Sequence, residues 1–420
     1  GLNPDKIWDI NKNKIIEKFN KKEKIIKQKP LDFLNNVINN FNSKIPKNVP
    51  AMASMLVGYF SYDVIRYIEN IPNKNKDDLK IPDVRLSRPK NLIIYDNYKK
   101  KIYYIENIYA DNKIKNYYEK YESIKNKFKS YQHFENIKLP IRFNFNKNKN
   151  KIKSNISKNS FKKNIIKAKK HIAKGDVFQV VLSQRFERKI NKSPLEIYNY
   201  LRISNPSPFM FYFNYDDFKI LGSSPEILVR LRNNEVTIRP IAGTRPRGNN
   251  KTQDIKYEKE LLKDKKELAE HLMLLDLGRN DVGKVSKINS VKVTESFNVE
   301  KYSHVMHIVS NVVGKFDKKN SLFETLLSGF PAGTVSGAPK IRAMEIIDNL
   351  EKTKRKLYAG GIGYFTSSKE FDTCIALRTS LIKNGKIYVQ SGAGIVADSV
   401  PEKEYQETVN KAKALMKAVD

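Results

Sequence analysis

Residues 331–345, Pro-Ala-Gly-Thr-Val-Ser-Gly-Ala-Pro-Lys-Ile-Arg-Ala-Met-Glu, form a stretch of small side chains that runs directly into a helix predicted from 338 to about 350. Gly333 and Gly337 allow main-chain N–H groups to face a ligand, and Pro339 suits the first turn of the helix. The positive end of that helix would then face a carboxylate. A simple turn has the same composition, so this stretch alone does not show whether it binds anything.

Three longer segments narrow the interpretation. They read Ile-Arg-Pro-Ile-Ala-Gly-Thr-Arg-Pro-Arg-Gly (238–248), Glu-Leu-Ala-Glu-His-Leu-Met-Leu-Leu-Asp-Leu-Gly-Arg-Asn-Asp (267–281) and Gly-Ala-Gly-Ile-Val-Ala-Asp-Ser-Val-Pro-Glu-Lys-Glu-Tyr-Gln-Glu-Thr (392–408). Together with Val-Met-His-Ile-Val-Ser (305–310), they resemble the signature blocks of the chorismate-utilising enzymes, from about residue 155 to the C-terminus. The resemblance implies large antiparallel β-sheets packed in a sandwich with flanking helices.

Length and cysteine content limit the classes of protein to which this chain can belong. A chain of 420 residues can bury a large core in one or two domains. The single cysteine, Cys374, excludes an internal disulfide framework and a thiolate metal cluster, and a reducing cytoplasm is the expected location. The sequence has no apolar run long enough to cross a bilayer and no signal-peptide pattern, so we expect no membrane partner.

The charge balance suggests an alternative from a different class. Lys and Arg total 79 against 45 Asp and Glu, a formal net charge of +34. Taken alone, this excess favours a basic nucleic-acid-binding protein. The lysines are interleaved with Asn and Ile, as in 146–155, and do not gather in one aromatic-lined stripe. We therefore expect no nucleic-acid partner, although this charge would attract an anionic substrate.

The pattern of elements indicates an α+β fold. Apolar residues at helical spacing predict helices over 161–174, near 254–263 and 265–277, and from Pro401 onwards. Strands are predicted at 92–106, 177–186, 209–214, 218–222, 226–232, 235–240, 358–366, 372–381 and 386–391. Runs of such strands broken by helices are typical of antiparallel sheets and not of a doubly wound parallel fold.

The chain divides into three regions by composition. Residues 1–110 form an N-terminal region that also resembles the family, 111–160 a Lys/Asn-rich linker that begins with a polar helix, and 161–420 the chorismate-binding catalytic domain. The chain opens on Gly1 instead of Met, and we expect a preceding segment to be missing. The resemblance implies that such a segment contributes to a feedback-inhibitor pocket.

Two pairs of glutamates suggest a metal site. Glu267 and Glu270 lie three residues apart on one predicted helix, and Glu404 and Glu407 repeat this spacing on the terminal helix. Two such pairs brought together would suit Mg²⁺, although glutamates in a first helical turn also stabilise the macrodipole and pair with lysines. The resemblance implies that Glu270 and Glu407 are Mg²⁺ ligands, with Glu267 and Glu404 as second ligands or water-mediated contacts.

Arg378 is a candidate anion-binding residue. It stands on the predicted strand 372–381, which is otherwise apolar on that face, and an unpaired guanidinium there would be costly. A substrate carboxylate or an internal aspartate would satisfy it. The resemblance implies substrate contacts through Arg378 together with Gly243, Thr244, Thr334, Tyr358, Gly392, Ala393 and Gly394.

The resemblance also implies an acid and a base. His307 lies in a hydrophobic run, where a lone histidine is typical of a core position, but it matches the family histidine implicated in proton transfer as pyruvate leaves. Glu226, in Ser-Ser-Pro-Glu, matches the carboxylic acid that protonates the departing ring hydroxyl. Burial in a closed pocket would keep its pKa raised for that role.

Two positions distinguish the branches of the family. Relatives that add water to chorismate have a lysine base in place of Gln179, and a neutral amide cannot activate water in that way. Relatives that form aminodeoxychorismate for folate typically have a lysine in place of Ala242. The resemblance therefore implies a carbon–oxygen lyase that uses Mg²⁺, aminates chorismate with ammonia and eliminates pyruvate to give anthranilate for tryptophan synthesis. Aminodeoxychorismate formation is the alternative.

The expected partners follow from the same reasoning. Cys374 lies on a predicted strand and not at a nucleophile elbow, so a separate glutamine amidotransferase subunit has to supply ammonia, and free ammonium should replace it. The resemblance implies an assembly of two large and two small subunits with tryptophan as feedback inhibitor. Pro208, Phe209 and Met210 resemble the family's tryptophan-contacting segment.

Overall fold

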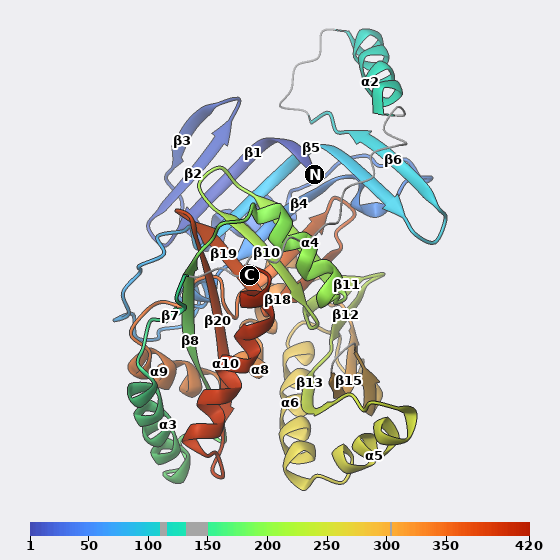
Figure 1. Ribbon diagram of the computed structural model, residues 1–420. Helices are drawn as coiled ribbons and strands as arrows, with labels where there is room; N and C mark the ends of the chain where they lie inside the picture. The colour runs from blue at the N-terminus through green and yellow to red at the C-terminus, as the bar shows by residue number, and fades with distance from the viewer. Residues whose placement is uncertain (110–115, 132–149, 303–304) are drawn as a thin grey trace.

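Two antiparallel sheets and the helices around them make up the computed structural model, which describes residues 1–109, 116–131, 150–302 and 305–420 (Figure 1). The larger sheet has 13 strands, in the order β13-β15-β12-β11-β18-β17-β4-β5-β1-β2-β3, with β14 pairing with β15 and β6 with β5. Its strands are β1 (Leu2–Asn11), β2 (Lys14–Phe19), β3 (Lys22–Ile26), β4 (Met55–Phe60), β5 (Val84–Asp96), β6 (Lys101–Glu106), β11 (Ile227–Arg232), β12 (Glu235–Ile238), β13 (Ile241–Pro246), β14 (Lys292–Lys301), β15 (Val305–Lys315), β17 (Gly361–Thr366) and β18 (Phe371–Ile375).

The smaller sheet has seven strands, in the order β16-β8-β20-β19-β10-β9, with β7 pairing with β8. Its strands are β7 (Lys153–Ser154), β8 (Gln179–Lys189), β9 (Phe209–Asn214), β10 (Lys219–Ser224), β16 (Gly337–Ala338), β19 (Thr379–Lys383) and β20 (Lys386–Ile395). All the pairings between these strands are antiparallel. The predicted α+β class with antiparallel sheets is therefore confirmed.

Several helices begin at residues that favour a helix start. Ser193 and Ser321 each form a capping box with the glutamate three residues later, and Pro401 occupies the first turn of the last helix. The helices are α1 (Pro30–Asn39), α2 (Tyr117–Tyr131), α3 (Lys158–Ala173), α4 (Pro194–Ser204), α5 (Lys251–Leu261), α6 (Lys265–Gly283), α7 (Leu322–Ser328), α8 (Gly333–Ser336), α9 (Lys340–Leu350) and α10 (Pro401–Lys417), with 3₁₀ turns η1 (Ala51–Ala53) and η2 (Tyr62–Tyr67). Among the described helices, none is long and apolar enough to cross a membrane.

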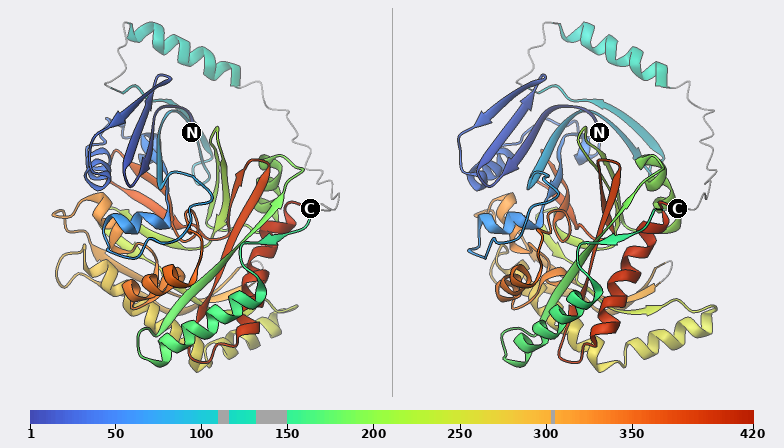
Figure 2. Two further views of the ribbon diagram at one scale, coloured as in Figure 1. Left: turned by 90° about the vertical axis from the view of Figure 1, so that its left-hand side faces the viewer. Right: turned by 60° about the vertical axis from the view of Figure 1, so that its left-hand side comes forward.

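An apolar layer joins the two sheets into a sandwich. Tyr59 and Ile362 from the larger sheet meet Ile220 and Leu381 from the smaller one in a single buried cluster. Neighbouring residues point to the opposite face, as strand geometry requires, so Leu221 and Ile382 pack in a separate cluster with α4 and α10. Figure 2 shows α3 (green) and α10 (red) side by side along the smaller sheet.

The boundary predicted at 111–160 does not coincide with a boundary between sheets. Strand β4 from the N-terminal region pairs with β17 from the catalytic region, so both regions contribute to the larger sheet. The polar helix predicted at the start of the linker is α2. The rest of the predicted linker lies largely outside the described residues, and the division into 1–110, 111–160 and 161–420 stays a prediction.

Two predicted strands are each two strands. The segment 92–106 is a hairpin, in which β5 and β6 pair across a turn at 97–100. The segment 372–381 breaks after Ile375, because the chain leaves the larger sheet at the end of β18 and enters the smaller sheet at β19. Arg378 therefore lies in the link between the sheets and not on a strand, which corrects the prediction.

Candidate active site

Two links between the sheets lie side by side and place an acid next to a cation. The chain passes from β10 to β11 through Glu226 and from β18 to β19 through Arg378. Because β10 pairs with β19 and β11 pairs with β18, both links occur at the same level of the sandwich. The Ile375 amide donates to the Glu226 carbonyl at 3.1 Å, and the Ser223 amide donates to the Arg378 carbonyl at 3.1 Å.

Burial controls the charge of Glu226. Its side chain belongs to a residue that is 5% exposed, and this burial raises its pKa to about 8. The Thr334 hydroxyl, the Ile241 backbone and the positive charges of Arg378 and Lys411 act in the opposite direction, but they do not outweigh burial. Glu226 is therefore held largely protonated at neutral pH, as a general acid requires.

Arg378 has a strained backbone and has no side-chain partner among the described residues. Its φ of 47° lies in the left-handed region, which side chains other than glycine rarely adopt. Within the described ranges its guanidinium makes no hydrogen bond or ion pair, and burial lowers its pKa. The internal aspartate considered from the sequence is not found there, so the guanidinium remains free to bind an external anion.

His307 is held in one tautomer. It lies on β15, and its Nδ1 is 2.9 Å from the Gly243 carbonyl and 3.1 Å from Thr244 Oγ1. A carbonyl only accepts hydrogen bonds, so Nδ1 carries the proton and Nε2 keeps its lone pair. Burial lowers the pKa of His307 to about 4, which leaves the ring neutral at pH 7. His307 can therefore accept a proton through Nε2.

A glycine in β13 makes this contact possible. Gly243 has φ +70° at a bulge between Ala242 and Thr244, and an added Cβ would lie 3.1 Å from Ile308 Cδ1 and 3.3 Å from Glu267 Oε2. The bulge turns the Gly243 carbonyl and the Thr244 hydroxyl towards His307. Ala242 itself is 8% exposed and lies in the strand before the bulge.

The first pair of glutamates lies against β8 and β20. Glu270, on α6, accepts a hydrogen bond from Gln179 Nε2 at 2.8 Å. A Cβ on Gly394 would lie 2.5 Å from that same nitrogen and 3.7 Å from Glu270 Oε1, so this stretch of β20 approaches the glutamate by its bare backbone. Burial raises the pKa of Glu270, and the charge of Glu267 raises it further. Glu267 itself pairs with Arg245 at 3.4 Å.

The second pair lies on α10, which packs against β20. Burial raises the pKa of Glu404, with a further contribution from Glu407. Glu407 is half exposed and pairs with Lys411 at 2.6 Å. The positive charges of Lys266 and Lys411 lower the pKa of both Glu270 and Glu404, so the same two lysines influence both glutamate pairs. Tyr358 completes this side, since an added Cβ on Gly392 would lie 2.6 Å from its hydroxyl.

The donor set fits a hard divalent cation. Glu404 is buried and Glu270 is partly buried, neither forms an ion pair with any described residue, and their raised pKa values show the cost of holding their charge. Carboxylate oxygens with room for water are the ligands that Mg²⁺ prefers. Within the described ranges, no group of three His, Cys, Asp or Glu side chains lies close enough together to hold a metal ion by itself. The residues present therefore suit a cation that takes further ligands from water or substrate.

The opening stretch of small residues is explained partly by packing. A Cβ on Gly333 would lie 2.2 Å from Leu277 Cδ2 of α6, and one on Gly337 would lie 2.2 Å from the Gln179 carbonyl. These glycines let α8 and β16 approach α6 and β8 closely, and this approach brings Thr334 to Glu226. Helix α9 begins at Lys340, whose Nζ pairs with Asp281 at 2.8 Å.

Two residues of this site were missed from the sequence. Lys411 acts electrostatically on Glu226, Glu270 and His307, and its Nζ donates to the Gly392 carbonyl at 3.1 Å. Tyr302 lies 5.6 Å from His307 between ring centroids and donates to Glu300 at 2.8 Å. The only signal for Lys411 was its position one turn after Glu407, and that signal is common in a lysine-rich chain.

The segment predicted to bind tryptophan lies apart from these residues. Pro208 precedes β9, the strand at the edge of the smaller sheet, and Phe209 and Met210 begin it. Phe209 pairs with Ser224 of β10, and Ser224 precedes Glu226 by two residues, so this strand pairing links the segment to the site. Phe209 and Met210 pack on two different apolar clusters, and the inhibitor role stays a prediction.

An open cavity of about 1350 Å³ borders the metal side of the site. Gln179 and Glu270 form part of its wall, together with Phe178, Leu272 and Val293. A much smaller cavity of about 30 Å³ lies behind Glu226 and Thr334.

Comparison with known proteins identifies the family and the fold. A family model described as chorismate binding enzyme matches residues 3–417. Anthranilate synthase component 1 from Acetivibrio thermocellus is 45% identical over 425 residues, which cover 100% of this chain and 86% of that protein. The crystal structure of anthranilate synthase component I from Streptococcus pneumoniae superposes with a TM-score of 0.87 at 36% identity, covering 99% of this chain and 90% of that one.

A more distant structure shares the fold alone. The menaquinone-specific isochorismate synthase from Escherichia coli superposes with a TM-score of 0.69 at 18% identity, covering 100% of this chain and 89% of that one. The arrangement of two antiparallel sheets with flanking helices is thus common to proteins of divergent sequence. The resemblance drawn from the signature segments is confirmed.

Proposed function

The chain belongs to the chorismate binding enzyme family, and from this premise we propose that it converts chorismate and ammonia to anthranilate and pyruvate. Relatives that match it along its whole length are anthranilate synthase components, which favours this product over aminodeoxychorismate. The enzyme acts on chorismate, a dicarboxylate with a ring hydroxyl and an enolpyruvyl ether. The site needs a cation for the carboxylates, an acid for the hydroxyl and a base for a ring proton.

The proposal rests on the two adjacent links between the sheets, from β10 to β11 and from β18 to β19. One link holds Arg378, a cation without a partner among the described residues, and the other holds Glu226, an acid with its pKa raised to about 8. A group that binds a carboxylate therefore lies beside a group that can donate a proton at neutral pH. This combination suits an anionic substrate that loses a hydroxyl group.

Substrate binding would use charge and bare backbone. Arg378 would bind one carboxylate of chorismate, with Thr244, Thr334 and Tyr358 as further donors. Gly392, Ala393 and Gly394 of β20 present main-chain groups where side chains would collide with Tyr358 or Gln179. The Glu267, Glu270, Glu404 and Glu407 carboxylates would hold Mg²⁺, whose chemistry there is to neutralise and orient a substrate carboxylate.

Glu226 would act in the first half of the reaction. It would donate its proton to the departing ring hydroxyl as ammonia adds to the ring, so that water leaves in place of hydroxide. Gln179 supports ammonia as the nucleophile: its Nε2 is committed to Glu270, while its Oε1 is a buried acceptor without a partner in the described part of the chain. An N–H of ammonia could donate to that oxygen, whereas a lysine at this position could not accept it.

His307 would act in the second half. Its neutral Nε2 would take the proton from the ring carbon that carries the new amino group, as the bond to the enolpyruvyl oxygen breaks and pyruvate leaves. The ring then becomes aromatic. The Gly243 carbonyl and Thr244 hydroxyl keep the imidazole oriented for this step.

We further propose that a glutamine amidotransferase subunit supplies the ammonia, in an assembly of two large and two small subunits located in the cytoplasm. The name component 1 of the relatives supports a second component. Cys374 is buried on β18 and its pKa is raised to about 12 by burial, so it is no glutaminase nucleophile. Tryptophan would act as feedback inhibitor through Pro208, Phe209 and Met210.

Product stoichiometry tests the proposal against its alternative. The purified chain is incubated with chorismate, MgCl₂ and ammonium, and the products are separated by chromatography. Equal amounts of anthranilate and pyruvate support the proposed function. Accumulation of an aminated product without pyruvate would assign the chain to the aminodeoxychorismate branch instead.

A further inference from the structure

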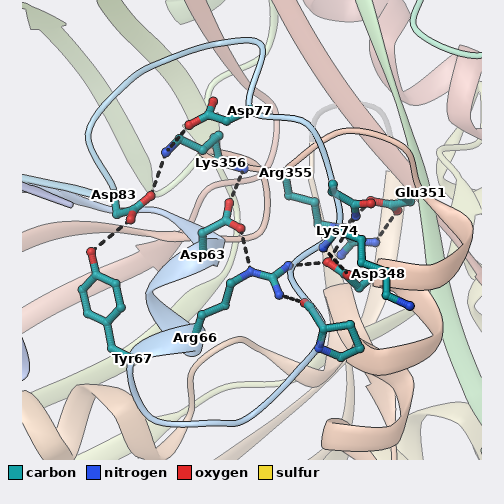
Figure 3. Close-up of polar contacts among 12 residues, drawn as sticks. Asp63, Arg66, Tyr67, Lys74, Asp77, Asp83, Asp348, Glu351, Arg355 and Lys356 are labelled. Atoms are coloured by element: carbon teal, nitrogen blue, oxygen red, sulfur yellow. Dashed lines mark hydrogen bonds and ion pairs between the residues drawn. The ribbon is translucent and has the colours of Figure 1, made fainter. Parts of the chain in front are cut away.

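The fully buried Arg355 contacts three segments that carry residues of the site. Arg355 lies between α9 and β17 and is 2% exposed. Figure 3 shows it beside Glu351, at the edge of a cluster of buried ion pairs between η2 and the end of α9. Its Nε donates to Glu351 Oε2 at 2.9 Å and its Nη2 to Glu351 Oε1 at 2.6 Å. This bidentate pair fixes the plane of the guanidinium.

The remaining donors of Arg355 bind backbone carbonyls of two site segments. Its Nη1 donates to the Val335 carbonyl at 2.8 Å, and its Nη2 donates to the Val181 carbonyl at 2.7 Å. Val335 follows Thr334 in α8, and Val181 lies two residues after Gln179 in β8. One side chain therefore sets the distance between the segment that faces Glu226 and the segment that faces Glu270.

The third segment is the one that carries Tyr358. The guanidinium lies 5.5 Å from the centroid of the Tyr358 ring and 5.0 Å from that of Tyr62. Such contacts favour a fixed orientation of the rings around the cation. Glu351 adds to the same arrangement, because it also accepts from the backbone and hydroxyl of Ser183 on β8, at 2.8 Å each.

A neighbouring arginine shows that burial in the cluster does not by itself produce these contacts. Arg66 is also buried and binds Asp63 at 3.0 Å, Asp348 at 2.5 Å and the Pro72 carbonyl. None of these three acceptors lies on β8, α8 or the segment of Tyr358. Arg66 thus matches Arg355 in charge, burial and partner types, but these three partners lie outside the site.

We propose that Arg355 is a positioning residue for chorismate binding, which aligns β8, α8 and Tyr358 through its planar donors. This inference rests on the proposed function for the identity of the substrate. A lysine at this position keeps the charge opposite Glu351, but it cannot reach the Val335 and Val181 carbonyls together in one plane. The positioning role therefore requires the guanidinium and not merely a buried cation.

The test compares Arg355→Lys with Arg66→Lys. Chorismate KM and kcat are measured with ammonium, and chorismate affinity is measured by calorimetry, which does not depend on turnover. Both variants are expected to fold and to lose some thermal stability. Only Arg355→Lys is expected to raise KM and Kd for chorismate, by about tenfold, the effect of losing roughly one charge-assisted hydrogen bond. Its kcat should change much less, because the lost contacts hold substrate and transition state alike.

Two results would overturn the inference. The first is a wild-type KM and Kd in Arg355→Lys, and the second is an equal rise in Arg66→Lys. If Arg355→Lys fails to fold, Glu351→Gln serves instead, since it keeps an acceptor for Ser183 but loosens the guanidinium, and it should raise Kd in the same direction. A wild-type chain that binds chorismate without forming anthranilate would contradict the proposed function and leave the comparison of affinities decisive for Arg355.

Discussion

At the scale of single residues, the site depends on two groups whose pKa values burial moves in opposite directions. Burial raises the pKa of Glu226 to about 8 and lowers that of His307 to about 4. The acid is therefore protonated below about pH 8, while the base is neutral above about pH 4. Both groups are in their working forms between these limits, so a single site can donate one proton and accept another.

The pH dependence of turnover follows from these values. We predict that kcat/KM for chorismate, measured at a fixed concentration of free ammonia, is flat between the two limits and falls above about pH 8 as Glu226 loses its proton. Glu226→Gln should lower kcat/KM for chorismate by a factor of about 10² to 10⁴. The residual activity of this variant should lack the fall above pH 8. A fall that persists unchanged in Glu226→Gln would assign the upper limit to another group.

Some residues of the site could be predicted from the sequence and others could not. Glu226, Arg378 and His307 were identified by resemblance, since each stands in a recognisable segment, but their environments were not visible. Arg378 has no side-chain partner in the described ranges. Whether a carboxylate comes near it is decided by tertiary contacts with residues distant in the sequence. Lys411 was missed because a lysine in a chain with 79 Lys and Arg residues gives no signal of its own.

At the scale of elements, α6 and α10 each bring two carboxylates towards β20. The pairs were predicted from their spacing, but their environments differ. Glu404 is buried and Glu270 is partly buried, and neither has an ion pair in the described residues. By contrast, Glu267 pairs with Arg245 and Glu407 pairs with Lys411. A metal ion between α6 and α10 would offset the unpaired negative charge of Glu270 and Glu404. For Glu267 and Glu407 it would compete with their present partners, Arg245 and Lys411.

Thermal stability provides a readout of this metal site without turnover. We predict that Mg²⁺ together with chorismate raises the Tm of the wild-type chain, and that Glu407→Gln abolishes the part that depends on Mg²⁺. The variant should fold, because Glu407 is half exposed and its pair with Lys411 contributes little, about 0 to 1 kcal/mol. Glu402→Gln is the matched control, since Glu402 lies on the same helix and pairs with Lys158 and Lys162. An equal loss in both variants would count against the metal assignment.

The elements that the sequence predicted wrongly share a physical cause. The segment 372–381 mixes apolar and polar residues and is buried along almost its whole length, so periodicity cannot show that the chain changes sheets at 376–378. The break matters, since it gives Arg378 its positive φ and its place beside Glu226. The hairpin of β5 and β6 was predicted as one strand, although Asp96 and Asn97 at its turn are typical turn residues.

At the scale of the whole molecule, a net charge of +34 surrounds a site for a dianion. We predict that kcat/KM for chorismate falls several-fold as NaCl rises from about 20 to 300 mM, because salt screens the attraction between protein and substrate. The value of kcat should stay nearly constant, since the bound complex no longer depends on this attraction. Stopped-flow or steady-state fluorescence measures both quantities. An equal fall in kcat and kcat/KM would point to an effect of salt on the site itself.

The sandwich itself was predicted only through the family resemblance. Composition and periodicity indicate α+β, but they do not show that β4 pairs with β17, 300 residues later in the chain, or that 13 strands form one sheet. Such pairings depend on contacts between distant segments, which local patterns do not contain. The two links between the sheets, and therefore the meeting of Glu226 and Arg378, are consequences of this topology.

The formation of anthranilate by the isolated chain tests the central claim most directly. Purified protein is mixed with chorismate, MgCl₂ and ammonium just below about pH 8, where Glu226 still keeps its proton, and anthranilate fluorescence is followed with and without EDTA. We predict fluorescence that depends on ammonium and disappears with EDTA, which would show amination and elimination on this one chain. Chorismate consumption without anthranilate, or anthranilate formation that EDTA does not affect, would contradict the account.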